Sequence, residues 1–473
     1  MRVCLVQPTG GGVPPLGIAY LASVLRNDGH DVSIIDIQAM GFGESEIYTF
    51  LKNGNFDLVG SGSVTSGFYR ALRVLKIAKK VANETDRKIF TVYGGVHAML
   101  VEEKMFDDNT NEYLDAVVVG EGENTLKELV KFLEQGKSLK DINGLIYREN
   151  GEIRKNPPRP PIQNLDELPF PAWDLLPIEK YKGFSLITSR GCPYSCIYCC
   201  VGTIYGHKWR GRSAENVIAE MRYLIKNYGA KHFAFVDDSF NLDMKRAKEI
   251  CQRIIENNWR ITWEASQGIR LNFLDAELVD LMKKSGCLFL GAGIETGDAE
   301  TMKILKRGIT KEKIAQSIKL LHGAGITTRG FFLMGNPGDT PEKLRKSFEF
   351  GKQLGLRSMG FTFLIPYPKT EYTEWILKHG KILVLELEKY DGRLHKPLVW
   401  LPTLSPREAM ETYRWIMKEV SRYNLSQYLA HPSMVFKSAR VRLKLAIFHH
   451  IYHIIFNLIP QSLGLKKELV DFF

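Results

Sequence analysis

Short, continuous apolar runs rich in β-branched residues recur through the first part of the chain and alternate with amphipathic stretches. Such runs occupy residues 3–6, 32–36, 58–61, 89–93 and 116–119. Apolar positions at helical spacing predict helices at residues 16–27 and 124–134. Apolar strands that alternate with helices are typical of parallel sheets covered on both faces. The pattern therefore predicts an α/β domain with a doubly wound, Rossmann-like sheet over residues 1–140.

The same alternation returns between residues 181 and 375. Strand candidates lie at 184–188, 232–236, 261–265, 288–293, 328–333 and 359–364. Amphipathic helices are expected between them, for example at 214–227 and 275–285. Six repeated strand–helix units predict a second parallel sheet in this part of the chain.

The stretch between the two units, residues 141–180, has a different composition. Residues 143–154 resemble a small hairpin with Asn150 and Gly151 as its turn. Two proline-dense segments follow at 156–162 and 168–174, and they suit an extended linker that crosses between domains.

The last part, residues 376–473, is expected to be mostly helical, with a helix at 406–424 that begins after Ser405. Residues 445–459 are apolar but interrupted by histidines, so this run is too short and too polar to span a bilayer. Basic residues precede it, namely Lys437, Arg440, Arg442 and Lys444. Such a helix suits peripheral contact with an anionic membrane surface, and it suits docking on the second domain equally well.

Composition narrows the class of protein. A hydrophobic content of 44% and a charged content of 25% are those of a globular chain with its own cores. The formal net charge is +11, but no nucleic-acid-binding motif is present, and we expect no nucleic-acid partner. The seven cysteines do not form a disulfide framework, and the first residues are typical of a strand and not of a signal peptide. We therefore expect a cytoplasmic protein.

Three cysteines stand out by their spacing. Cys192, Cys196 and Cys199 form a C-x₃-C-x₂-C pattern in a loop after the first strand of the second unit. A 4Fe–4S cluster has four irons, and three thiolates would leave one iron open to a non-protein ligand. Ordinary core cysteines are one alternative. Zinc is another, although it prefers paired halves and no second half is present.

This loop resembles the cluster loop of the radical S-adenosylmethionine (SAM) enzymes, in which an aromatic residue such as Tyr198 precedes the last ligand. The resemblance implies an incomplete (β/α)₆ barrel and a 4Fe–4S cluster. The open iron of that cluster would chelate SAM and cleave it to a 5′-deoxyadenosyl radical. Cys200 departs from the pattern and competes with Cys199 as a ligand. We favour Cys199, because its spacing from Cys196 is that of the family.

Further motifs support the resemblance in order along the chain. Asp237 and Asp238 follow the second strand, where the family contacts the SAM amino group; either residue could also cap the next helix. Arg270 lies at the end of the third strand, and Glu295, after the fourth, would bond the SAM ribose. Arg329 lies in the fifth unit and is expected to contact cofactor.

The first domain is similar to the cobalamin-binding domain attached to one large class of radical SAM enzymes. The residues that carry this similarity lie at 15–22, 94–97 and 119–123. The expected cobalamin contacts are small or glycine-adjacent residues at strand ends: Gly10, Gly11, Ser63, Thr65, Gly94, Gly95, His97, Gly120, Glu121 and Gly122. His97 has an alternative role as a loop residue bonded to backbone. Residues 36–41 mimic the D-x-H-x-x-G frame of other cobalamin proteins, but Gln38 replaces the histidine and the stretch follows the second strand, so we interpret the match as a coincidence. The resemblance implies cobalamin with no protein histidine on its lower face. No G-x-G-x-x-G follows the first strand, which disfavours a nicotinamide cofactor.

The resemblance implies C-methylation of an unactivated carbon, with the adenosyl radical removing hydrogen and methylcobalamin delivering the methyl group. Ring formation without methyl transfer, as in the anaerobic Mg-protoporphyrin ester cyclases, is the first alternative. A non-catalytic cobalamin or Fe–S sensor is the second. Hopanoid methylases and bacteriochlorophyll-pathway methyltransferases suggest a lipid, tetrapyrrole or other large apolar substrate. The reaction also needs a one-electron donor such as ferredoxin or flavodoxin.

Overall fold

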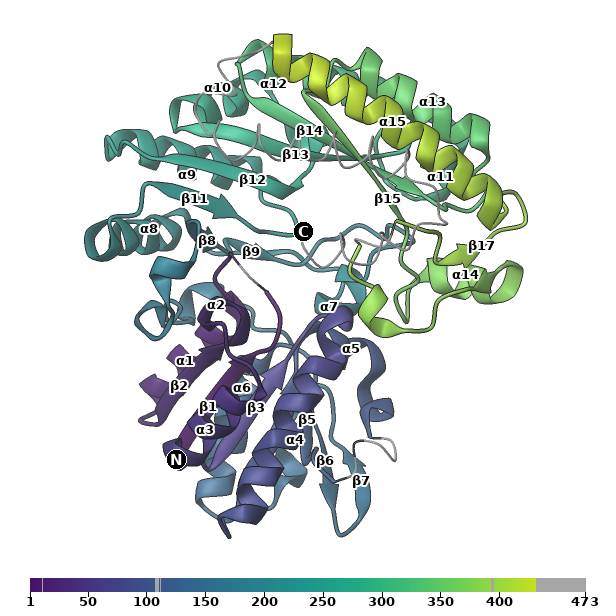
Figure 1. Ribbon diagram of the computed structural model, residues 1–473. Helices are drawn as coiled ribbons and strands as arrows, with labels where there is room; N and C mark the ends of the chain where they lie inside the picture. Colours follow the sequence, from purple (N-terminus) through teal and green to yellow (C-terminus); the bar gives the residue numbers. More distant parts are fainter. Residues whose placement is uncertain (11, 107–109, 111, 393–394, 431–473) are drawn as a thin grey trace.

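The computed structural model describes residues 1–10, 12–106, 110, 112–392 and 395–430, which form two α/β units (Figure 1). The first contains a seven-stranded sheet of order β2-β1-β3-β4-β5-β6-β7. Its parallel strands are β1 (Arg2–Gln7), β2 (Asp31–Asp36), β3 (Leu58–Gly62), β4 (Phe90–Gly94) and β5 (Ala116–Val118). This order confirms the doubly wound prediction, and β1 and β3 flank its switch point.

Helices cover both faces of this sheet. One face carries α1 (Leu16–Asn27) and α6 (Gly122–Glu134), and the other carries α3 (Glu44–Gly54) and α4 (Phe68–Glu84). The alternation of side chains along β1 explains the two layers, because Val3 and Leu5 join the α1 core while Cys4 and Val6 join the α4 core. Two short helices follow strand ends, α2 (Ile37–Met40) and α5 (Val96–Val101).

The predicted hairpin is present as β6 (Leu145–Glu149) and β7 (Glu152–Lys155), with Asn150 and Gly151 at its turn. It does not stand apart as a linker element. β6 pairs antiparallel with β5, so the first sheet continues to Lys155, past the boundary at residue 140 that composition suggested.

The second unit is an open barrel of six parallel strands in the order β15-β14-β13-β12-β11-β8, as the repeated pattern predicts. Its strands are β8 (Phe184–Leu186), β11 (His232–Phe235), β12 (Thr262–Ile269), β13 (Cys287–Glu295), β14 (Thr327–Met334) and β15 (Ser358–Phe363). The helices between them are α8 (Ala214–Tyr228), α9 (Met244–Glu256), α10 (Ala276–Lys284), α11 (Ala299–Ile304), α12 (Lys311–Gly323) and α13 (Pro341–Gln353).

The C-terminal part contains α14 (Glu371–His379), the short strands β16 (Lys381–Ile382) and β17 (Val399–Trp400), and α15 (Pro406–Ala430). Ser405 and Glu408 bond each other's backbone amides at the start of α15, which confirms the predicted helix start. α15 crosses the outside of the barrel beside α13 (Figure 1). The basic segment with Lys437, Arg440, Arg442 and Lys444 lies outside the described residues. No helix within the described ranges is long and apolar enough to cross a membrane.

The two units meet through loops at the carboxyl ends of both parallel sheets. The Tyr181 hydroxyl donates to Asp36, at the end of β2, over 2.9 Å, and the amide of Lys182 donates to the carbonyl of Gly12 after β1. Lys369, after β15, forms an ion pair with Glu102, after α5. Ligands of parallel sheets bind at these strand ends, so this junction is where two cofactor sites would face each other.

Candidate cluster and cobalamin site

A pair of short antiparallel strands brackets the cysteine loop. β9 (Ser189–Arg190) precedes it and β10 (Arg210–Gly211) closes it, with α7 (Val201–Tyr205) between. The amide of Cys199 donates to the carbonyl of Cys196, and the Ser239 hydroxyl lies 3.4 Å from the Cys192 sulfur. The loop therefore presents the predicted thiols from a tight turn beside the end of β11.

Three thiols presented from one loop are a donor set that an iron–sulfur cubane can use. Within the described part of the chain, no three His, Cys, Asp or Glu side chains converge as the ligands of one ion would. A cubane takes one thiolate on each iron, so its cysteines stand around a space and do not meet at a point. Burial raises the pKa of the Cys199 thiol to about 12, with Cys200, Cys196 and Cys192 adding to the effect. Iron must therefore displace a proton from this thiol.

Cys200 occupies a different environment from the three thiols of the motif. It is the residue that precedes α7, and burial raises the pKa of its thiol, with the charge of Asp238 as a further contribution. The prediction that Cys199 and not Cys200 is the third ligand stays a prediction.

The two aspartates after β11 support the loop from the barrel side. Asp237 is buried, and it accepts hydrogen bonds from the amide and hydroxyl of Thr188 and from the hydroxyl of Ser189. Asp238 accepts from the amide of Gly191 over 2.9 Å. Burial raises the pKa of both carboxyl groups. Both residues therefore help to shape the cysteine loop, and a contact with the SAM amino group stays a prediction.

Glu295, at the carboxyl end of β13, joins the cluster loop through Tyr198. The Tyr198 hydroxyl donates to Glu295 Oε1 over 3.1 Å, and the Arg307 guanidinium lies 3.1 Å from that hydroxyl and 3.3 Å from the same carboxylate oxygen. Glu295 has a φ of +67°, a left-handed conformation that non-glycine residues rarely adopt. Burial and the charge of Glu295 raise the pKa of Tyr198 well above its usual value. These contacts bring the predicted ribose ligand next to the cluster loop.

Arg307 was not predicted from the sequence. It follows α11 in a loop, where an isolated arginine usually faces water, and no local pattern marks it as buried. Among the residues that the structure describes, nothing accepts a hydrogen bond from its buried Nε.

The two other predicted arginines lie in different places. The Arg270 guanidinium stacks 3.5 Å from the centre of the Tyr194 ring and donates to the carbonyl of Arg307, so it belongs to the group around the cluster loop. Arg329 is level with Gly291 in the barrel sheet, whereas Glu295 is level with Phe332. Three residues of strand separate these levels by about 10 Å. The structure therefore does not bring Arg329 to the Glu295 group, and its contact with cofactor stays a prediction.

In the first domain the predicted residues gather after β1, β3 and β4. The Ser63 amide donates to the carbonyl of Gly94, its carbonyl accepts from the amide of His97, and its hydroxyl lies 2.9 Å from that of Tyr93. Gly95 has a φ of +90°, and an added Cβ would lie 3.0 Å from the Ser63 amide nitrogen. This close backbone packing requires glycine. Gly10 donates its amide to Gln38, and Gly11 lies outside the described residues.

His97 is buried below this loop and does not point freely into a ligand site. Its Nδ1 lies 3.2 Å from the Thr65 hydroxyl, and its ring centre lies 4.5 Å from that of Phe68. Burial lowers the pKa of the imidazole to about 4, so His97 is neutral at pH 7. The structure differs from the loop alternative, since His97 lies on α5 and its ring bonds a side-chain hydroxyl and not the backbone. Its role toward cobalamin stays a prediction.

In the loop after β5, the glycines and the Glu121 side chain have different surroundings. Gly120 has a φ of +93° with open space where a Cβ would stand, and Gly122 begins α6. The Glu121 carboxylate instead contacts the second domain, because both of its oxygens accept from Arg190 and Arg210. The glycines remain the predicted cobalamin contacts in this loop, whereas the Glu121 side chain is engaged elsewhere.

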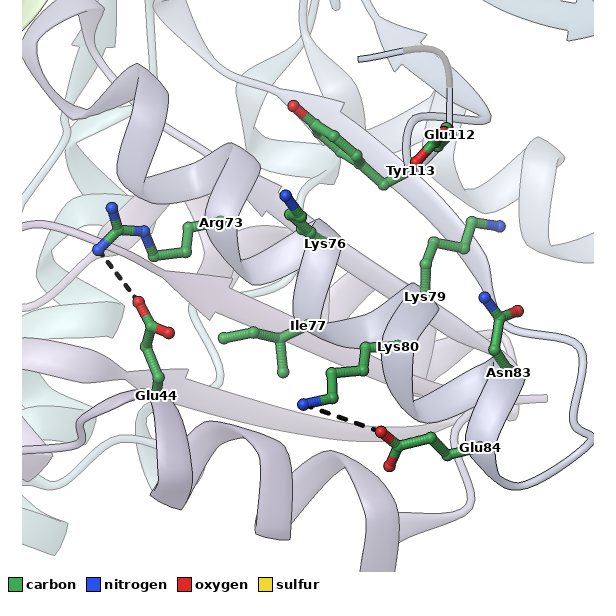
Figure 2. A pocket seen from close by; sticks show the side chains of 10 residues that line it. All are labelled: Glu44, Arg73, Lys76, Ile77, Lys79, Lys80, Asn83, Glu84, Glu112 and Tyr113. Atoms are coloured by element: carbon green, nitrogen blue, oxygen red, sulfur yellow. Dashed lines mark ion pairs between the residues drawn. The ribbon is translucent and has the colours of Figure 1, made fainter. Parts of the chain in front are cut away.

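A separate pocket of about 760 Å³ lies along α4 of the first domain, where Glu44 of α3 and Glu112 and Tyr113 before β5 complete its lining (Figure 2). Two ion pairs join residues of its lining, Arg73 to Glu44 over 3.0 Å and Lys80 to Glu84 over 3.8 Å. None of the predicted site residues lines it.

Comparisons with known proteins agree with this two-domain arrangement. The B12 binding domain matches residues 2–130, and the Radical SAM superfamily matches residues 186–351. An uncharacterized methyltransferase of Pyrococcus horikoshii is 39% identical over 82% of this chain and 86% of its own length. The anaerobic magnesium-protoporphyrin IX monomethyl ester cyclase of Rubrivivax gelatinosus is 27% identical over 83% of this chain and 72% of its own.

A solved structure shows the same fold. The radical SAM methyltransferase TsrM from Kitasatospora setae, with cobalamin and a [4Fe-4S] cluster bound, superposes with a TM-score of 0.71 at 20% identity. The match covers 88% of this chain and 90% of that one.

A doubly wound B12 domain followed by a three-cysteine open barrel defines a cobalamin-dependent radical SAM enzyme. The chain belongs to the radical SAM superfamily, in the class whose members carry an N-terminal B12 binding domain. Its cofactors are a 4Fe–4S cluster, SAM and cobalamin, and it requires an electron donor and a substrate.

Proposed function

We propose that this enzyme transfers a methyl group to an unactivated carbon of a large apolar substrate. The observation that carries the proposal is the junction itself, where the cysteine loop of the barrel contacts the strand-end loops of the B12 domain. A radical made on one side of this junction and a methyl group held on the other would reach the same substrate. The match to a relative named as a methyltransferase supports it.

The protein's own part is to bind and orient. Cys192, Cys196 and Cys199 would hold the cluster, and Glu295, fixed by Tyr198 and Arg307, would hold the SAM ribose. When bound, the cluster and SAM supply a 5′-deoxyadenosyl radical that removes hydrogen, and cobalamin supplies the methyl group. Backbone at Gly120 would approach the corrin closely, since open space lies where its Cβ would stand.

Exposed apolar side chains at the junction support an apolar substrate. Val64, after β3, is 53% exposed, and Leu385 is 76% exposed. They flank the contact between two short 3₁₀ helices, η1 (Thr65–Gly67) of the first domain and η8 (Leu387–Lys389) of the C-terminal part. A lipid or a tetrapyrrole matches this surface, because burying apolar area on either partner stabilises the complex.

Cyclisation without methyl transfer is the second candidate, because a cyclase also matches most of this chain. Protein reconstituted anaerobically with iron, sulfide and cobalamin would be incubated with SAM, a reductant and candidate lipids or tetrapyrroles. A methyltransferase forms S-adenosylhomocysteine and a substrate product heavier by one methylene, together with 5′-deoxyadenosine. A cyclase forms 5′-deoxyadenosine without that mass increase, which would overturn the proposal.

We propose ferredoxin or flavodoxin as the physiological electron donor.

A further inference from the structure

Two buried carboxylates of the B12 domain bind two buried arginines of the barrel. Glu121 Oε1 accepts from Arg190 over 2.9 Å and Glu121 Oε2 accepts from Arg210 over 2.8 Å, while Glu123 Oε1 accepts from Arg190 over 2.6 Å. The four side chains are between 5% and 10% exposed. Two negative and two positive charges balance in this group. Such a group is tolerated in a protein interior only while every member keeps its partners.

These arginines stand at the two ends of the cysteine loop. Arg190 is the second residue before Cys192, and Arg210 is the residue to which it pairs when β10 closes the loop on β9. The Glu121 carboxylate therefore holds both ends at once. The guanidinium of Arg190 also lies 5.5 Å from the ring centre of Tyr20, which α1 of the same domain contributes.

Gly191, the one residue between Arg190 and Cys192, is held in a fixed backbone conformation. Gly191 has a φ of +85°, and an added Cβ would lie 2.2 Å from the carbonyl oxygen of Lys208. Its amide is bonded to Asp238. A displacement of Arg190 would therefore also displace Cys192, the first cluster ligand, because Gly191 between them cannot absorb the movement.

We propose that Glu121 and Glu123 are positioning residues for the cluster, fixing the ends of the cysteine loop against the B12 domain through Arg190 and Arg210. This positioning of the cluster loop is the same whether the enzyme methylates or cyclises its substrate. It also gives the Gly120–Glu123 stretch after β5 a role in the second domain, besides its predicted contact with cobalamin.

The test compares the double variant Glu121→Gln/Glu123→Gln with Glu220→Gln. The latter removes a charge from another buried ion pair, in which Glu220 lies on α8 and Arg212 lies between β10 and that helix. After reconstitution with iron and sulfide, the reduced cluster is followed by electron paramagnetic resonance during titration with SAM. We expect the double variant to need about tenfold more SAM for the same spectral change, which corresponds to about 1.4 kcal/mol. The Glu220→Gln protein should titrate like the wild type. Equal titrations for wild type and double variant would overturn the proposal.

A second measurement uses protein without the cluster and tests the same proposal if the double variant folds poorly. Hydrogen exchange of the single variant Glu123→Gln is compared with that of the wild type. We expect amides in residues 190–211 to exchange about tenfold faster, while those of β12 and β13 are unchanged. Exchange that accelerates equally throughout the barrel, or not at all, would contradict a positioning role. Neither readout depends on turnover, so the proposal can fail while the proposed function stands.

Discussion

Tyr198 donates its hydroxyl hydrogen to Glu295 across 3.1 Å, which ties the residue before the last cluster cysteine to the carboxyl end of β13. Arg307 contacts both groups, and its side chain is 13% exposed. The carboxylate is thus held in place by a phenol and a guanidinium, and its strained backbone is kept in position by the same contacts.

Replacing Arg307 with methionine should weaken SAM binding strongly. The change leaves the Glu295 carboxylate buried without its cation, a situation that costs about 3–5 kcal/mol in stability. We expect SAM affinity to fall about 100-fold, an effect of about 2.7 kcal/mol. Tyr198→Phe removes one hydrogen bond and should cost only about tenfold. Equilibrium dialysis of the cluster-loaded proteins measures both values. Unchanged affinity in Arg307→Met would show that Glu295 does not contact SAM.

The buried imidazole of His97 should make stability depend on pH. Its folded pKa of about 4 lies below the unfolded value near 6.5, so the unfolded chain binds more protons between these pH values. The stabilisation is fully present above about pH 6.5 and is lost as the pH falls toward 4, by about 3 kcal/mol at most. Urea unfolding of wild type and His97→Gln at pH 7.5 and pH 5 provides the comparison. The wild type should lose more stability than the variant between pH 7.5 and pH 5. Equal losses in the two proteins would indicate that the His97 imidazole is exposed to water in the folded state.

Alanine at Gly95 should disturb the loop that is predicted to meet cobalamin. The left-handed backbone and the 3.0 Å approach to the Ser63 amide nitrogen both oppose a Cβ, at a cost of about 1–3 kcal/mol. Gly136 is a matched control, because it has a φ of +62° but open space around it. We expect Gly95→Ala, and not Gly136→Ala, to lower cobalamin retained after desalting, as measured by absorbance. Equal retention in both variants would count against this loop as the corrin site.

Removal of the thiol of Cys200 tests the ligand assignment. We expect Cys200→Ala to assemble the cluster and to cleave SAM within about twofold of the wild type, because the family spacing selects Cys199. Cys199→Ala should hold no stable cluster. The cluster content of both variants is measured by iron and sulfide analysis after desalting. If Cys200→Ala lost the cluster and Cys199→Ala kept it, the assignment would be reversed.

Local patterns were sufficient to predict both sheets and the cysteine loop. Strand β1 contains the continuous apolar run of residues 3–6, and the spacing of the three cysteines is a local property of the sequence. The hairpin of β6 and β7 was located correctly, but its pairing with β5 was not foreseen. Pairing between strands is a long-range property that one strand's sequence does not determine.

The contacts between domains were beyond the reach of local patterns. Glu121 was expected to face cobalamin because its neighbours are glycines, whereas its carboxylate binds Arg190 and Arg210, which lie 69 and 89 residues away. Arg307 was missed for the same reason. A charged residue becomes a buried partner only through the fold around it, and a single sequence gives no sign of which distant charge completes the pair.

The formation of 5′-deoxyadenosine is the measurement that tests the central claim most directly. Wild-type protein carrying iron, sulfide and cobalamin would be reduced anaerobically with SAM, and the nucleoside would be quantified by chromatography. We predict 5′-deoxyadenosine in excess of the amount of protein, and none above background from Cys196→Ala. A wild-type protein with an intact cluster that produced no more than the Cys196→Ala variant would contradict the account.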